Sequence, residues 1–167
     1  MSRHIEHNST FSNAAKTVYA AFIDAGYLRD KLAALGGPGA QLLAIEHTAD
    51  GASYHTQHSI DSRSLPSAVR AVLNRDFTID RKEVWRAGGD GFSGTVSVTI
   101  AGMPGQLDGT LALADDADGS RYAIRGEISV PIPLVGGKIE ESVGTQITRL
   151  LAAETQFTEK WLADHAD

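Results

Sequence analysis

The segment that decides the fold reads Pro131-Ile132-Pro133-Leu134-Val135-Gly136-Gly137-Lys138-Ile139-Glu140. It follows a β-rich stretch that ends at Val130, and it begins an amphipathic helix that we expect to cover residues 134–162. Apolar residues recur along this helix at three- and four-residue steps, which puts them on one stripe: Val135, Ile139, Val143, Ile147, Leu150, Leu151, Phe157 and Trp161. The stripe must pack against a large apolar surface encoded earlier in the chain.

The polar face of the same helix has mixed charge. It is expected to carry Glu140, Glu141, Arg149, Glu154, Glu159 and Lys160. A helix that binds a membrane surface has a mainly basic polar face, so packing against the protein's own sheet is the better interpretation.

The earlier residues predict a sheet with helices near its start. Residues 3–11 predict a strand, and residues 14–23, with Ser12 or Asn13 as a cap, predict a helix. A second helix is expected over 27–35, then strands from Gln41 to Val130, interrupted by a short helix over 64–74. We therefore predict one α+β domain over residues 1–167, in the order β-α-α-β-β-(α)-β-β-β-β-α. Its seven-stranded curved antiparallel sheet surrounds a long C-terminal helix.

Three Asp-Gly pairs set the expected strand pairing. Asp50-Gly51, Asp90-Gly91 and Asp118-Gly119 are strong signals for two-residue hairpin turns. Counting outward from these turns, and from a looser turn over 102–105, pairs residues that share one face: His47 with Tyr54, Ile45 with Thr56, Leu43 with His58, Trp85 with Val96, Glu83 with Val98, Ile100 with Leu107, Leu113 with Ile124 and Leu111 with Gly126. That face points toward the C-terminal helix.

The expected inner wall has an apolar half and a polar half, and both are candidate ligand contacts. The apolar candidates, with three from the helix, are Trp85, Phe92, Val96, Val98, Leu111, Tyr122, Ile124, Ile139, Val143 and Ile147. The polar candidates are His47, Tyr54, Thr56, His58, Arg81 and Glu83. Buried polar groups without partners cost about 1–3 kcal/mol each, so these must pair, meet water or meet a ligand.

Arg81 and Glu83 lie two residues apart on one strand, beside Tyr54 and His58. One interpretation is a structural ion pair that seals the sheet. The other is a polar anchor for a ligand head group, or an acid/base set whose pKa values shift on burial.

Bulk composition excludes several classes of protein. With 167 residues, 42% hydrophobic and 22% charged, the chain has ordinary globular composition. A net charge of -6 disfavours nucleic acid as a partner, and no uncharged run is long enough for stable membrane insertion. The N-terminus lacks the apolar region of a signal peptide and cysteine is absent, so a cytoplasmic location is expected.

Three motifs suggest a cofactor or a metal, but each lacks the accompanying residues that such a site requires. Residues 89–96 match the kinase glycine loop GxGxxGxV, but no lysine-bearing strand or catalytic loop accompanies them. Residues 115–119 resemble a calcium loop without its required first and last ligands. The six histidines lack zinc-site spacing; only His47 and His58, with His7 as a third candidate, are expected to share the inner face. We therefore expect no cofactor, no metal and no assigned catalytic residue.

The element order and several local segments resemble a known superfamily. The segments are Leu65-Pro66-Ser67-Ala68-Val69, Glu83-Val84-Trp85, Phe92-Ser93-Gly94-Thr95-Val96 and residues 133–140. They resemble the START-like superfamily, which has the helix-grip fold and is also called Bet v 1-like or SRPBCC. This superfamily includes the polyketide cyclase/dehydrase group. More narrowly, the chain is similar to the uncharacterised DUF2505 family. The resemblance implies fold and family but assigns no activity to any residue.

Three functional hypotheses follow. The first is binding of a hydrophobic or amphipathic small molecule, such as a lipid, isoprenoid or polyketide, between sheet and helix. The second is a cyclase, dehydratase or aromatase in which Glu83, His58 and Tyr54 act as acid or base. The third is a protein-interaction module whose groove is filled by Trp85, Phe92 and Tyr122. The sequence leaves the ligand and the oligomeric state open.

Overall fold

The structure is a computed structural model that describes residues 2–61, 63, 66–71 and 77–166. The elements follow the predicted order. The strands are β1 (Ser2–Phe11), β2 (Gln41–His47), β3 (Gly51–Ile60), β4 (Phe77–Gly88), β5 (Gly91–Ile100), β6 (Gln106–Asp116) and β7 (Gly119–Ser129). The helices are α1 (Ala15–Phe22), α2 (Ala25–Leu35), α3 (Ser67–Arg70) and α4 (Gly136–Asp164).

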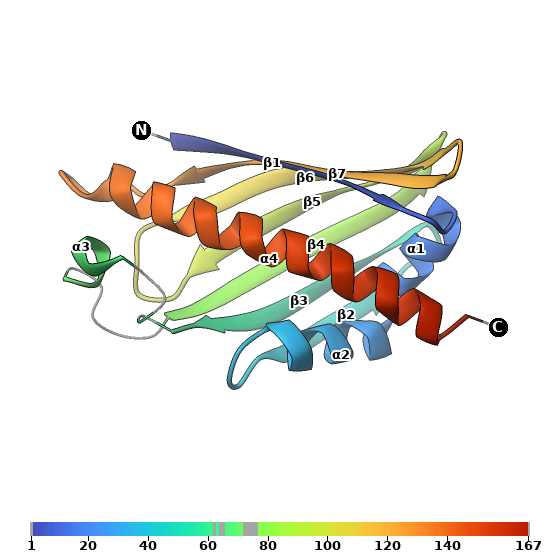
Figure 1. Ribbon diagram of the computed structural model, residues 1–167, viewed down its shortest axis with the longest axis horizontal. Helices are drawn as coiled ribbons and strands as arrows, with labels where there is room; N and C mark the ends of the chain where they lie inside the picture. The colour runs from blue at the N-terminus through green and yellow to red at the C-terminus, as the bar shows by residue number, and fades with distance from the viewer. Residues whose placement is uncertain (1, 62, 64–65, 72–76, 167) are drawn as a thin grey trace.

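The seven strands form one antiparallel sheet in the order β1-β7-β6-β5-β4-β3-β2. Helix α4 lies across the concave face of this sheet, with α1 and α2 near one end and α3 near the other (Figure 1). The predicted α+β helix-grip architecture is therefore confirmed. No described helix is long and apolar enough to cross a membrane.

All four predicted hairpin registers are wrong by two residues, and all four have the correct face. Ile45 pairs with Tyr54 rather than Thr56. Likewise, the structure pairs Glu83 with Val96, Leu111 with Ile124 and Val98 with Leu107. Side chains alternate with a period of two along a strand, so a shift of two residues does not by itself move a side chain to the other face.

In the three Asp-Gly hairpins, the shift arises because the glycine is the first residue of a strand rather than the second residue of a turn. In the β2–β3 turn, the Thr48 N–H donates to the Gly51 carbonyl at 2.8 Å, which leaves Ala49 and Asp50 at the centre. A Cβ on Gly51 would lie 2.0 Å from the Trp85 carbonyl oxygen of β4. The neighbouring strand thus leaves no room for a side chain, and glycine is required there for close approach rather than for turn geometry.

Strand β2 contains a further departure from the predicted pairing. A β-bulge between Leu42 and Ala44 places Leu42 opposite Thr56. Leu43, predicted to meet His58, is instead 43% exposed. The extra residue in the bulge reverses the face of the side chains before it.

Helix α1 takes its cap from a distant part of the chain. The predicted caps, Ser12 and Asn13, do not fill this role, since Ala14 occupies the N-cap position without a side-chain bond. Instead, the Ala15 N–H donates to Asp115 Oδ1 of β6 at 2.8 Å. Helix α2 is capped locally, with the Tyr27 N–H donating to Asp24 Oδ2 at 2.9 Å.

The short helix predicted over 64–74 is partly described. Helix α3 covers Ser67–Arg70, and residues 64–65 and 72–74 of the prediction lie outside the described residues. The α3 helix contacts α4, near the first half of that helix in the view of Figure 1.

Candidate functional site

The groove between sheet and α4 is filled by aromatic side chains at the end covered by α1 and α2. Phe22 lies between Tyr122 and Trp85, with ring centroids 5.1 Å and 5.7 Å away. Phe92 stacks on Tyr19 of α1 at 4.0 Å. Tyr54 is buried in the same region, and its hydroxyl accepts from Trp85 Nε1 at 3.2 Å. This end of the groove is therefore solid core, as the third hypothesis anticipated for Trp85, Phe92 and Tyr122.

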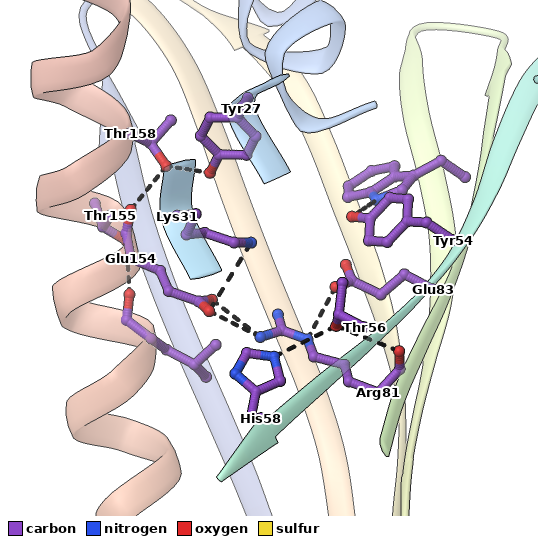
Figure 2. Close-up of polar contacts among 12 residues, drawn as sticks. Tyr27, Lys31, Tyr54, Thr56, His58, Arg81, Glu83, Glu154, Thr155 and Thr158 are labelled. Atoms are coloured by element: carbon purple, nitrogen blue, oxygen red, sulfur yellow. Dashed lines mark hydrogen bonds and ion pairs between the residues drawn. The ribbon is translucent and has the colours of Figure 1, made fainter. Parts of the chain in front are cut away.

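A buried ion network lies across the middle of the groove, with Arg81 at its centre (Figure 2). Arg81 Nε lies 2.9 Å from Glu83 Oε2 on the same strand. Its Nη1 donates to both carboxylate oxygens of Glu154 on α4, at 3.2 Å and 2.9 Å. Lys31 Nζ of α2 is 3.9 Å from Glu154 Oε2. These four side chains therefore connect β4, α2 and α4 with two positive and two negative charges.

The placement of Glu154 corrects the sequence analysis, which assigned this residue to the polar face of α4. Glu154 is 8% exposed and faces Arg81, and Glu140 is also buried, with its Oε2 accepting from the Val130 N–H at 2.8 Å. Glu154 lies three residues after Leu151 and seven after Ile147, so helical spacing already puts it on the buried stripe. Its negative charge had suggested a position facing solvent. The helical spacing from Leu151 and Ile147 was the signal that could have identified Glu154 as a buried residue.

The network continues to α2 through hydroxyl groups that the sequence analysis did not identify. The hydroxyls of Tyr27 and Thr158 lie 2.6 Å apart, and Thr158 Oγ1 donates to the Glu154 carbonyl at 2.7 Å. Burial raises the pKa of Tyr27, and of Tyr54 and Tyr122, so these phenols remain neutral at pH 7. They contribute hydrogen bonds and packing rather than charge.

Charge pairing within the network outweighs burial. Burial alone would raise the pKa of Glu154, but Arg81 and Lys31 lower it to about 2. For Arg81, burial would lower the pKa, and Glu154 and Glu83 instead raise it well above the ordinary value. Arg81 and Glu154 therefore stay ionised at pH 7, because each lies against a side chain of opposite charge.

His58 of β3 lies next to this network and is 7% exposed. Its Nε2 is 3.3 Å from Thr56 Oγ1, and the Thr56 hydroxyl points toward the Arg81 carbonyl at 3.5 Å. Burial, with the positive charges of Arg81 and Lys31, lowers the pKa of His58 to about 4 against the opposing effect of Glu154. The ring is therefore neutral at pH 7.

We expect acid to destabilise the protein in two steps. Between pH 6.5 and 4 the unfolded chain binds a proton on His58 that the folded chain does not. The free energy of unfolding therefore falls by about 3 kcal/mol as pH decreases through this window. A second loss of about 3 kcal/mol follows between pH 4.5 and 2, where Glu154 must be protonated. Urea unfolding at a series of pH values measures both steps.

The His58→Gln variant isolates the first step. It should reduce the slope of the stability curve between pH 6.5 and 4 to what His7 contributes, since burial also lowers the pKa of His7. The matched variant His4→Gln, at an exposed position on β1, should keep the wild-type slope. Equal slopes in wild type and His58→Gln would contradict the assignment to His58.

A cavity of about 310 Å³ occupies the other end of the groove, beneath the first half of α4. Most of its wall is apolar, from Ile5, Leu35, Ile79, Val96, Val98, Ile100, Leu107, Leu111, Ile124, Ile128, Val130, Val143, Ile147, Leu150 and Leu151. Its inner end is formed by His58 and Arg81, and half-buried or exposed polar residues form other parts of the wall, namely Ser59, Asp61, Gln106 and Gln146. The cavity is thus an apolar pocket with a polar inner end.

Half of the candidate ligand contacts line this cavity. They are His58, Arg81, Val96, Val98, Leu111, Ile124, Val143 and Ile147. Tyr54, Glu83 and Tyr122 instead surround a void of only about 20 Å³ beyond Arg81.

The remaining candidates lie elsewhere. Thr56 supports His58, Trp85 and Phe92 belong to the aromatic cluster, and Ile139 is fully buried in the core. His47 is exposed at the end of the edge strand β2, where its Nε2 lies 2.7 Å from the Ile23 carbonyl after α1. His7 is also separate, and its Nε2 lies 3.2 Å from Thr155 Oγ1 of α4. Within the described residues, no group of three or more His, Asp or Glu side chains is arranged to hold a metal ion.

Several proteins of known structure have the same architecture as this chain. The protein TTHA0849 of Thermus thermophilus superimposes with a TM-score of 0.66 at 11% identity, covering 99% of this chain and 100% of that one. The Zhui aromatase/cyclase of a Streptomyces species gives 0.64 at 12% identity, covering 100% and 97%. Norcoclaurine synthase of Thalictrum flavum gives 0.60 at 16% identity, covering 99% and 88%. These likenesses show a shared Bet v 1-like fold.

Sequence similarity identifies the family. The uncharacterised protein Rv0481c of Mycobacterium tuberculosis is 28% identical over 173 aligned residues, which cover 99% of each chain. A protein of Mycobacterium bovis matches to the same extent. The family model described as "Protein of unknown function (DUF2505)" matches residues 6–162. The chain therefore belongs to the DUF2505 family, whose helix-grip architecture it shares with Bet v 1-like proteins.

Proposed function

We propose that this protein binds a hydrophobic or amphipathic small molecule in the cavity between the sheet and the first half of α4. The observation that carries the proposal is the cavity itself, about 310 Å³ and mostly apolar. This volume lies at the lower end of the range typical of small-molecule sites, roughly 300–1,000 Å³. Burial of the ligand body would contribute about 25 cal/mol per Å² of apolar surface.

The ion network supports binding in this half of the groove. Arg81 and Leu151 line both the cavity and the small void beyond it, so the network forms the boundary between the hollow end and the solid end. Because α4 is attached to the sheet there through Glu154, the hollow end does not depend on a ligand to hold helix and sheet together.

The acid/base groups considered for a cyclase are not arranged around the cavity. Glu83 pairs with Arg81, and the Tyr54 hydroxyl bonds to Trp85. Neither side chain lines the cavity, and His58 alone of the three does. Small-molecule binding without chemistry is therefore the function that the geometry favours.

We expect a Val98→Trp substitution to lower affinity for the neutral fluorescent probe N-phenyl-1-naphthylamine by at least about tenfold, because the indole occupies the cavity. Val98 lies on its wall. The matched control is Val84→Trp on the outer face, where Val84 is 45% exposed, and probe binding there should be unchanged. Probe fluorescence titration measures both, with circular dichroism to verify folding. Equal binding by a folded Val98→Trp variant would overturn the proposal.

A further inference from the structure

One residue at the inner end of the cavity has a buried side-chain nitrogen that makes no hydrogen bond. His58 Nδ1 is one of three such side-chain atoms among the described residues, and the other two are Ser9 Oγ and Ser120 Oγ. Of these residues, His58 alone lines the cavity, and it is 7% exposed. A buried polar atom without a partner costs stability, so a bound molecule whose polar group reaches this nitrogen gains a hydrogen bond that the free protein lacks.

The contacts of Thr56 determine which kind of hydrogen bond His58 offers. The Thr56 hydroxyl lies 3.5 Å from the Arg81 carbonyl oxygen and 3.3 Å from His58 Nε2. A carbonyl oxygen only accepts and a hydroxyl has one hydrogen, so both contacts are hydrogen bonds together only if Thr56 donates to Arg81 and accepts from His58. We therefore assign the ring proton to Nε2. Since the low pKa of His58 keeps the ring neutral at pH 7, Nδ1 has a free lone pair and acts as an acceptor.

The charges beside His58 are already balanced. Arg81 contacts the carboxylates of Glu83 and Glu154, and Lys31 Nζ lies 3.9 Å from Glu154. Two cations thus neutralise two carboxylates. An anionic head group entering this end would find no uncompensated positive charge in the network, and would lose its hydration in an apolar cavity. A cationic head group would likewise lack an unpaired carboxylate there.

The geometry points to an uncharged ligand with an apolar body and one terminal hydroxyl, which donates its hydrogen to His58 Nδ1. This inference rests on the proposed function, because it specifies the class of molecule that the same cavity takes. The inferred site should bind alcohols and phenols more tightly than fatty acids or ethers of the same size.

Three matched probes test this inference by calorimetry at pH 7: decan-1-ol, its isomer 1-methoxynonane, and decanoate. The alcohol should bind about tenfold more tightly than the ether, which cannot donate a hydrogen bond, and also more tightly than the carboxylate. In His58→Phe the difference between alcohol and ether should disappear, whereas the control His4→Phe should retain it.

The outcomes separate the two proposals. If the ether or the carboxylate binds as tightly as the alcohol, the acceptor assignment is wrong and the apolar binding site stands. If none of the three binds, and N-phenyl-1-naphthylamine does not bind either, both proposals fail.

The protonation state of His58 Nδ1 can also be measured in the absence of a ligand. Nitrogen-15 NMR of the free wild-type protein at pH 7 should show His58 with protonated Nε2 and unprotonated Nδ1. The opposite tautomer would make Nδ1 a donor and overturn the inference, whether or not the variants fold.

Discussion

An Arg81→Met variant is expected to lose about 3–5 kcal/mol of unfolding free energy, measured by urea denaturation at pH 7. The substitution leaves Glu83 and Glu154 buried without the guanidinium that contacts both, and Glu154 keeps Lys31 at 3.9 Å as its cationic neighbour. Arg125→Met on β7 is the matched control. There the side chain is 71% exposed and its partner Glu6 is 3.5 Å away, so stability should change by less than about 0.5 kcal/mol.

The cost in Arg81→Met arises mainly from the two orphaned carboxylates. Adding Glu83→Gln and Glu154→Gln to the same chain should therefore restore part of the lost stability, because amides need no counter-charge. A loss below about 1 kcal/mol in Arg81→Met would contradict a structural role for the network. It would also remove the stated boundary between the two ends of the groove.

A Trp85→Ala variant is expected to lose about 3–5 kcal/mol, because it empties the centre of the aromatic cluster. Trp85 is 2% exposed and contacts Phe22 and Tyr122, and its Nε1 donates to the Tyr54 hydroxyl. Free indole has the shape of the missing group and should raise the melting temperature of this variant in a concentration-dependent manner.

The control for this experiment is Trp161→Ala. Trp161 is half-buried on α4 and its Nε1 bonds to Asp30 at 3.0 Å, so its loss should cost less than the loss of Trp85. If both variants lose the same stability, or if indole does not act on Trp85→Ala, the solid end of the groove is less well packed than the structure indicates.

The overall fold could be predicted because its signals are periodic. The stripe from Ile139 to Leu151 identified α4, and the alternation of apolar residues identified the inner face of the sheet. Strand pairing was harder. An Asp-Gly pair signals that a turn is near, but the space beside Gly51 and Gly91 depends on the carbonyls of neighbouring strands, which no local pattern contains.

The site was only half predictable for a similar reason. Arg81, Glu83 and His58 were expected on one face because they follow strand alternation, and they do lie together. Their partners come from two helices: Glu154 of α4, whose charge suggested solvent, and Lys31 of α2, for which the sequence offered no signal. Which half of the inner wall is hollow also could not be predicted, since it depends on how Phe22 and Tyr19 of α1 fill the other half.

The shifted hairpins have a consequence for how this chain tolerates changes in loop length. Lengthening a strand by two residues at the Gly51 or Gly91 end moves the turn but retains the same set of side chains facing α4. Adding a single residue would exchange the two faces of that strand, so that its inward side chains point outward. The bulge after Leu42 shows this effect at the sheet edge. Insertions and deletions that leave the pocket wall intact in relatives should therefore come in even numbers.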